Sequence, residues 1–151
     1  MNRPVGHRAL RKGRVSLPRH IYLVTAVTAY RRPLFKDTDM ARAFSQSMLD
    51  PRCWGDASPL CWVLMPDQWH GLIELGPSDS LSLVINRVKA VTAKRLGCVQ
   101  PSLVWGRGYH DRALRKEEDL RTVARYLVAN PLRAGLVDHV LDYPYWNCIW
   151  L

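Results

Sequence analysis

Two side chains that can bind a metal lie two positions apart in a predicted strand. Gln68 and His70 belong to the apolar segment 68–75, and alternate residues of a strand project from the same face. An imidazole nitrogen and an amide oxygen are both metal ligands, so this pair would hold a divalent ion and leave positions open for phosphate oxygens. The alternative is an ordinary surface histidine that is hydrogen-bonded to its neighbours.

A second pair with possible chemistry lies in a predicted helix near the C-terminus. Tyr126 and Asn130 are four residues apart and therefore share one helix face beside an apolar stripe. A tyrosine can act as a covalent nucleophile toward phosphorus when a metal or nearby bases stabilise its phenolate. The alternative is that Tyr126 is half-buried packing and that Asn130 caps the helix.

The elements that must position these residues follow from the apolar patterns. Segments 60–65 and 68–75 are separated only by a Pro-Asp turn, so they pair as antiparallel strands. Segment 20–30 is rich in β-branched and aromatic residues and predicts another buried strand. Residues 80–96 carry a clear apolar stripe that ends at Gly97, which predicts a helix.

The remaining segments complete an alternating order of strands and helices. We expect a helix over 37–49, a loop over 51–59, and a loop followed by a strand over 103–114. A further helix runs from three acids at 117–119 to about residue 129, because Pro131 forces its end. The aromatic tail then packs back on the sheet. The order βαββαβα predicts a single α+β domain with an antiparallel sheet.

The charge distribution favours a polyanionic partner. The chain of 151 residues has 22 Lys and Arg against 13 Asp and Glu, a net charge of +9. Segment 1–19 is rich in arginine, includes Arg14, has no acid and reads as a flexible basic arm, with the folded domain over 20–151. Window 86–133 adds eleven bases against four acids. Nucleic acid is the first candidate partner, and an ordinary solvated basic surface is the alternative.

Membrane insertion and disulfide bonding are not expected. No apolar run approaches the roughly 20 residues that cross a bilayer. The four cysteines form no C-x-x-C pair and have no histidine at zinc-finger spacing. We therefore expect reduced thiols and a cytoplasmic protein.

Four segments, in order, resemble one family. Residues 65–72, MPDQWHGL, resemble the "MP-D/N-H-hydrophobe-H" signature of HUH single-strand nucleases. Residues 125–137, RYLVANPLRAGLV, resemble the "RYI-x-x-NP-x-RAGLV" run of the REP-associated tyrosine transposases. Residues 104–112, VWGRGYHDR, and 143–146, YPYW, are similar to two further motifs of that family. The resemblance extends from about residue 20 to the C-terminus.

The resemblance implies a ferredoxin-like sheet with the histidine strand at its centre and the tyrosine helix above it. It also implies a metal-dependent transposase or endonuclease in which Tyr126 attacks single-stranded DNA and forms a 5′-phosphotyrosine link. His70 would bind Mg²⁺ or Mn²⁺, with Gln68 and Asn130 as the other ligands. The implied substrates are REP palindrome hairpins with single-stranded guide bases, bound by a monomer or homodimer at the nucleoid.

One position departs from the family pattern and leaves the activity open. Gln68 stands where the family has the first histidine of its pair. A glutamine oxygen suits hard Mg²⁺ tolerably, so cleavage with weaker metal binding is one outcome. A hairpin-binding protein without cleavage is the alternative, and a general nucleic-acid module is a third interpretation that leaves the ordered motifs unexplained.

Candidate DNA contacts come from the basic residues and from exposed aromatic side chains. Trp69, Trp105 and Tyr109 are candidates for stacking on unpaired bases, with core packing as the alternative. The candidate phosphate contacts are Arg107, Arg112, Arg133, Lys94, Arg95 and Arg14. The alternative for the first three, which belong to the family motifs, is that they position the tyrosine helix.

Overall fold

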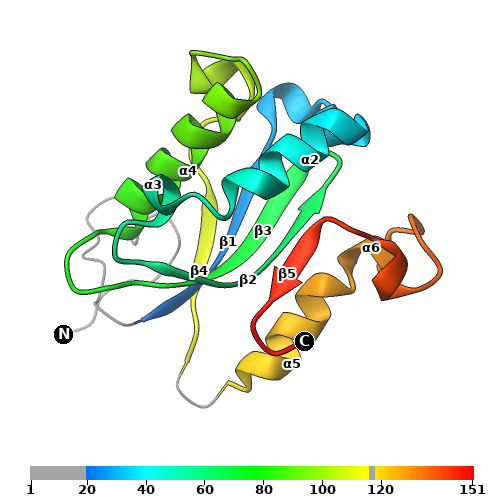
Figure 1. Ribbon diagram of the computed structural model, residues 1–151. Helices are drawn as coiled ribbons and strands as arrows, with labels where there is room; N and C mark the ends of the chain where they lie inside the picture. Colours follow the sequence, from blue (N-terminus) through cyan, green and yellow to red (C-terminus); the bar gives the residue numbers. More distant parts are fainter. Residues whose placement is uncertain (1–19, 116–117) are drawn as a thin grey trace.

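An antiparallel five-stranded sheet carries helices on both faces in the computed structural model, which describes residues 20–115 and 118–151 (Figure 1). The strand order is β4-β1-β3-β2-β5, and every neighbouring pair is antiparallel. The predicted α+β class is confirmed. The predicted arm, with Arg14, lies outside the described residues. The strands are β1 (Ile21–Val27), β2 (Ser58–Met65), β3 (Gln68–Glu74), β4 (His110–Ala113) and β5 (Trp146–Cys148).

Three helices cover one face of the sheet: α2 (Thr38–Ser47), α3 (Pro51–Trp54) and α4 (Leu81–Arg95). Phe44 of α2 and Trp54 of α3 are buried in one cluster with strand residues such as Trp69. Helix α4 begins where the Ser80 hydroxyl accepts a hydrogen bond from the Leu83 amide at 3.2 Å. It ends before Gly97, whose φ of 87° is the left-handed conformation that glycine adopts readily.

The opposite face is covered by α5 (Leu120–Val128), which leads into α6 (Asn130–Arg133). Leu127 and Val128 are buried against Val63 and Leu72 of the sheet. The Asp119 carboxylate caps α5 by accepting a hydrogen bond from the Arg121 amide at 3.0 Å. The tyrosine helix therefore packs over the central strands, as the resemblance implied.

The strand register decides which residues face α5. His70 of β3, the central strand, pairs with Thr25 of β1 and Val63 of β2. Directly opposed residues share a face, so His70 lies on the same side as the buried Val63 that packs under α5. Trp69, one position earlier, points to the other face and is 1% exposed.

Several element boundaries differ from those predicted. Segment 51–59 is not a loop, because Asp50 caps α3 and Pro51 occupies its first position, where a missing amide hydrogen is tolerated. Helix α5 starts after Asp119, so the predicted acids do not form its first turn. Helix α5 ends at Val128, close to the predicted end near residue 129, but a second short helix, α6, follows it with Pro131 near its start. The tail adds the edge strand β5.

In the described part of the chain, short 3₁₀ helices join these elements. They are η1 (Ala29–Arg31), η2 (Leu34–Lys36), η3 (Pro101–Leu103) and η4 (Val140–Asp142). Within residues 20–115 and 118–151, no helix has both the length and the apolar character that crossing a bilayer requires.

Candidate active site

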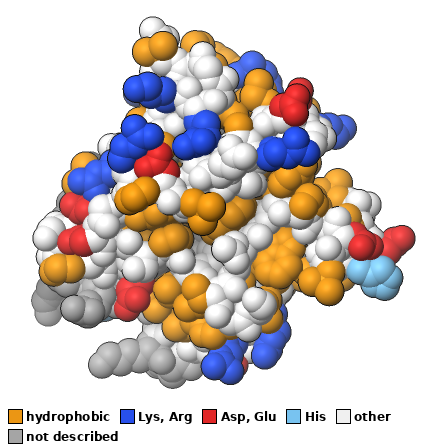
Figure 2. All heavy atoms as spheres, viewed as in Figure 1, with side chains coloured by type: hydrophobic (Ala, Val, Ile, Leu, Met, Phe, Trp, Pro, Cys, Tyr) orange, Lys and Arg blue, Asp and Glu red, His pale blue; other side chains and the backbone are white. Residues whose placement is uncertain are grey.

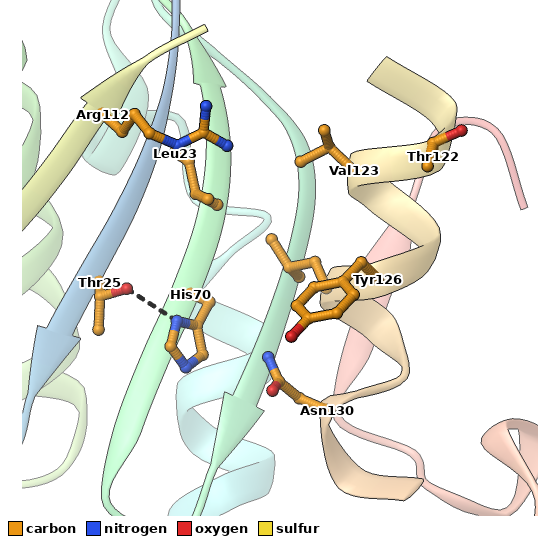
Figure 3. A pocket seen from close by; sticks show the side chains of 9 residues that line it. Leu23, Thr25, His70, Arg112, Thr122, Val123, Tyr126 and Asn130 are labelled. Carbon is orange, nitrogen blue, oxygen red and sulfur yellow. Dashed lines mark hydrogen bonds between the residues drawn. The ribbon is translucent and has the colours of Figure 1, made fainter. Parts of the chain in front are cut away.

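His70 is held by a hydrogen bond across the sheet. Its Nδ1 lies 2.8 Å from the Thr25 hydroxyl on β1, so Nε2 is the nitrogen left to bind an ion (Figure 3). The pKa of His70 is lowered from 6.5 to about 4, chiefly by burial; the nearby Asp67 raises this pKa, and Arg133 and Arg31 lower it. The imidazole is therefore neutral at pH 7, which is the form that binds metals.

Tyr126 projects from α5 toward His70. In Figure 3 its hydroxyl points into the space between His70 and Asn130. The tyrosine is 66% exposed, so a DNA strand can reach it. The Arg133 guanidinium lies over its ring, with the guanidinium carbon 3.6 Å from the ring centroid. A cation in this position attracts the electron-rich face of the ring and restrains its rotation.

Asn130 begins α6, immediately below Tyr126 in Figure 3. Its Oδ1 accepts a hydrogen bond from Nη2 of Arg133 at 2.8 Å. Arg133 therefore joins two residues that the sequence pattern had paired, which agrees with the alternative that it positions the tyrosine helix. The predicted alternative, a helix C-cap at Asn130, is wrong because Ala129 is the C-cap of α5.

These side chains line one open cavity of about 510 Å³ between β1, β3 and α5. The sequence-predicted residues His70, Tyr126, Asn130 and Arg112 all lie in its wall, although they come from four different elements. Its walls also include Leu23, Thr25, Thr122, Val123 and Leu127.

Gln68 lies apart from this cavity. It is the first residue of β3 and shares the sheet face of His70, as predicted, because it pairs with Met65 of the α5-facing core. It is not among the residues that line the cavity. His70 and Asn130 therefore line the same cavity, whereas Gln68 lies at the end of β3 and is not part of the cavity wall.

The residues present fit a weakly held hard cation better than a tightly bound one. No group of three His, Cys, Asp or Glu side chains in the described ranges is arranged to hold a metal. His70 is neutral and anchored through its other nitrogen, as metal-ligating histidines generally are. The Asn130 side chain lines the same cavity, but its oxygen is engaged by Arg133. One imidazole and one amide suit an ion that keeps most of its water ligands, as Mg²⁺ does.

Three of the predicted DNA contacts lie on the cavity side or at the adjacent sheet end. Arg112 lines the cavity and pairs with Glu118 at 2.9 Å. Arg133 stacks on Tyr126, as described above. Arg107 is exposed in the segment that precedes β4. Arg112 and Arg133 therefore lie at the cavity, whereas Arg107 follows Gly106, whose amide is hydrogen-bonded to the Val27 carbonyl at the end of β1.

Lys94 and Arg95 lie near the end of α4, on the opposite face of the sheet. Together with Arg52 they line a separate hollow of about 190 Å³. Arg95 lies 3.8 Å from Asp50, which also pairs with Arg52. Figure 2 shows several Lys and Arg side chains gathered on this side of the molecule. A DNA strand bound in the cavity would have to extend around the protein to contact Lys94 and Arg95.

The predicted stacking roles of Trp69 and Trp105 are wrong. They are 1% and 3% exposed and belong to the core between the sheet and α2–α4. The Trp105 indole nitrogen donates a hydrogen bond to the Thr92 hydroxyl at 3.0 Å. Tyr109 is half-buried, and its hydroxyl lies 2.7 Å from that of Ser82. The pattern of aromatic residues among basic ones does not reveal which side chains are buried.

Comparison with known proteins agrees with this geometry. The IS200-like transposase family model matches residues 16–130. A solved structure of a REP-associated tyrosine transposase bound to a REP hairpin has 22% identity, a TM-score of 0.70, and covers 88% of this chain and 79% of its own. A candidate transposase from Deinococcus radiodurans R1 has 20% identity and a TM-score of 0.54, over 79% of this chain and 95% of its own. No curated protein matches.

The two structural matches share the fold of this chain, and the family model spans the strand with His70 and the helix with Tyr126. The chain belongs to the IS200-like transposase family.

Proposed function

We propose that this transposase cleaves and rejoins single-stranded DNA with Tyr126 as its nucleophile. The observation that supports this is the meeting of Tyr126 and His70, from a helix and a strand far apart in sequence, in one open cavity. The exposed phenol and the neutral imidazole face a space that a phosphodiester can enter.

The proposed step is a transesterification at phosphorus. The Tyr126 oxygen forms a bond to the phosphorus and loses its proton to solvent. The bond from phosphorus to the 3′ oxygen breaks, and that oxygen takes up a proton and leaves as a free hydroxyl. The 5′ end remains linked to the tyrosine, and the reverse step by another 3′ hydroxyl rejoins a strand.

His70 and Asn130 would hold Mg²⁺ or Mn²⁺, with Gln68 as a third ligand only if DNA binding draws it inward. The ion would polarise the phosphate and offset the charge that develops during transfer. Thr25 fixes the imidazole orientation through Nδ1. Arg133 restrains the tyrosine ring and the Asn130 amide together.

We propose REP-type palindrome hairpins with single-stranded flanks as the substrate. The protein would then act on DNA at the nucleoid. The similar structure described as bound to a REP hairpin supports this partner class. Arg107, Arg112 and Arg133 would contact phosphates near the cavity, and Lys94, Arg95 and Arg14 more remote ones. A monomer or a homodimer is compatible with this proposal.

A second candidate is a hairpin-binding protein that does not cleave. The observation in its favour is the position of Gln68, which supplies no second imidazole and lies outside the cavity wall. Binding in this case would persist and remain salt-sensitive, because it depends on the basic surface.

The test is to mix the protein with a labelled single-stranded palindrome plus flanks, with Mn²⁺ or a chelator, and look for protein-linked DNA on a denaturing gel. We expect a metal-dependent band that Tyr126→Phe abolishes. Tyr145→Phe is the matched control, because it removes the hydroxyl of a part-exposed tyrosine that does not line the cavity.

Other outcomes separate the candidates. Salt-sensitive binding without a band, with a band restored by Gln68→His, would identify a binding protein with a lesion in its metal site. A band that persists in Tyr126→Phe would overturn the assignment of the nucleophile, and the absence of both binding and band would overturn the proposal.

A further inference from the structure

Tyr30 and Arg31 adopt an unusual backbone conformation directly after β1. Their φ angles are 57° and 55°, the left-handed region that side chains rarely occupy. Among the described residues, they are the only non-glycine residues with positive φ. Glycine would adopt these angles at lower cost, yet the first of the two positions carries a large aromatic ring.

The backbone around Tyr30 is fixed by its neighbours. The Ala29 amide donates a hydrogen bond to the Val104 carbonyl at 2.8 Å, and the Thr28 hydroxyl donates to the Arg32 carbonyl at 2.7 Å. Arg31 donates two hydrogen bonds to one oxygen of Asp67, at 3.1 and 2.9 Å. These hydrogen bonds therefore hold the strained turn in one conformation.

The Tyr30 side chain takes no part in these contacts. It is 95% exposed, the highest value among the large hydrophobic side chains of the described residues. Burial therefore does not account for an aromatic residue at this position. The turn holds the ring in solvent, where its face is open to a flat ligand.

The ring lies at the sheet end that carries Gln68. Val27, three residues before Tyr30, pairs with Gln68, and the Arg31–Asp67 ion pair ties the turn to the β2–β3 connection. The backbone of segment 104–106 is joined to the same end, because the Gly106 amide donates to the Val27 carbonyl at 2.9 Å. Exposed Arg31 and Arg32 follow Tyr30 directly, with the Arg31 guanidinium paired with Asp67 and the Arg32 guanidinium donating to the Ala29 and Leu103 carbonyls. Exposed Arg107 follows Gly106 at this end of β1.

An exposed, rigidly mounted ring among guanidinium groups has the chemistry of a site for an unpaired base. The base would stack on the ring while the arginines contact its flanking phosphates. We propose that Tyr30 is the stacking platform for an unpaired base in the single-stranded flank beside the cleaved strand. This inference rests on the proposed function and adds a site for the flank that the cavity does not provide.

The experiment measures binding of two oligonucleotides with chelator present, so that no cleavage occurs. One is a palindrome hairpin with a single-stranded flank that carries 2-aminopurine, and the other is the same hairpin without a flank. Tyr30→Ala should weaken binding of the flanked DNA about tenfold and abolish the quenching of 2-aminopurine. Tyr30→Trp should retain both, and binding of the bare hairpin should not change.

Tyr30→Gly distinguishes a ligand role from a structural one. Glycine relieves the backbone strain, so we expect a melting temperature at or above that of the parent together with the same tenfold loss for flanked DNA. A merely structural tyrosine would show loss of stability and unchanged DNA binding.

Two failures are distinguishable. If the parent protein binds both DNAs and Tyr30→Ala binds the flanked DNA equally well, the platform is overturned and the proposed function stands. If the parent protein binds neither DNA, the proposed function is overturned and the platform with it.

Discussion

Arg133 joins the two C-terminal residues of the cavity, since its guanidinium stacks on Tyr126 at 3.6 Å and donates to Asn130 Oδ1 at 2.8 Å. Tyr126 and Asn130 belong to different helices, α5 and α6. A single side chain thus couples the orientation of the proposed nucleophile to that of a proposed metal ligand.

Loss of Arg133 should slow the formation of protein-linked DNA. We expect Arg133→Ala to lower the rate of adduct formation about tenfold, because the tyrosine ring loses a cation–π contact of roughly 0.5–1 kcal/mol and Asn130 loses its donor. The rate of adduct formation in Arg133→Lys should lie between the rates of the parent protein and of Arg133→Ala. Arg121→Ala is the control, since it removes the same charge from the start of α5. Equal losses in both alanine variants would indicate a purely electrostatic effect.

The Thr25 hydroxyl should set the metal affinity of His70. Thr25→Val keeps the side-chain shape but removes the group that lies 2.8 Å from Nδ1. We expect Mn²⁺ binding, measured by calorimetry, to weaken on the order of tenfold, because the imidazole loses its fixed orientation. The free energy of unfolding should fall by about 1 kcal/mol. Thr25→Ser should preserve both values, and unchanged affinity in Thr25→Val would contradict this role.

Stability should decrease as the pH falls through the range in which only the unfolded His70 is protonated. The pKa of His70 is about 4 in the fold against 6.5 ordinarily. As the pH drops below 6.5, His70 therefore becomes protonated in the unfolded chain but stays neutral in the folded chain. This difference lowers the free energy of unfolding. By pH 4 this should amount to about 3 kcal/mol.

Urea denaturation of the parent and of His70→Asn at pH 7, 5.5 and 4.5 measures this effect. The difference in unfolding free energy between the two proteins should shrink as the pH falls, because asparagine does not titrate. Parallel pH dependences would show that His70 is not the group responsible.

The fold could be predicted from local patterns where those patterns were strong. The apolar runs in 60–65 and 68–75 and the two-residue turn between them predict the β2–β3 hairpin, and Gly97 marks the end of α4. The α3 helix was missed although Asp50 and Pro51 form a cap and first-position pair. The edge strand β5 has only three residues, and its pairing with β2 depends on tertiary contacts that no local pattern encodes.

The site was predictable in its residue types but not in its connections. Spacing predicted one helix face for Tyr126 and Asn130, but the two residues lie in successive helices, and their link through Arg133 depends on the chain turning from α5 into α6. Thr25 was not predicted, because its contact with His70 requires the register between β1 and β3. The burial of Trp69 and Trp105 likewise depends on the helices that cover the sheet.

Lys89 should stabilise the fold and not contact DNA, although it lies within the basic window. It is 8% exposed, and its ammonium donates to the carbonyls of Gly106 and Gly108, which flank Arg107. Burial lowers its pKa. We expect Lys89→Met to lower the free energy of unfolding by about 1–2 kcal/mol, because two carbonyls lose a charged donor.

Arg107→Met is the matched comparison, because it removes the exposed neighbouring charge. It should leave stability within about 0.5 kcal/mol and reduce the slope of log affinity against log salt concentration by about 0.7–0.9. Lys89→Met should leave that slope unchanged. If the slope decreased in Lys89→Met and did not change in Arg107→Met, Lys89 and not Arg107 would be the DNA contact.

Gln68→His should strengthen divalent metal binding if DNA or metal draws residue 68 toward the cavity. The new imidazole would lie two positions from His70 on the same face of β3, where two nitrogens can share an ion. We expect Mn²⁺ affinity to rise at least tenfold and protein-linked DNA to accumulate faster. Glu74→His is the control, because it adds an imidazole to the same strand face at its other end. Equal gains in both variants would indicate nonspecific metal binding, whereas no gain in Gln68→His would mean that His70 and Asn130 bind the ion without residue 68.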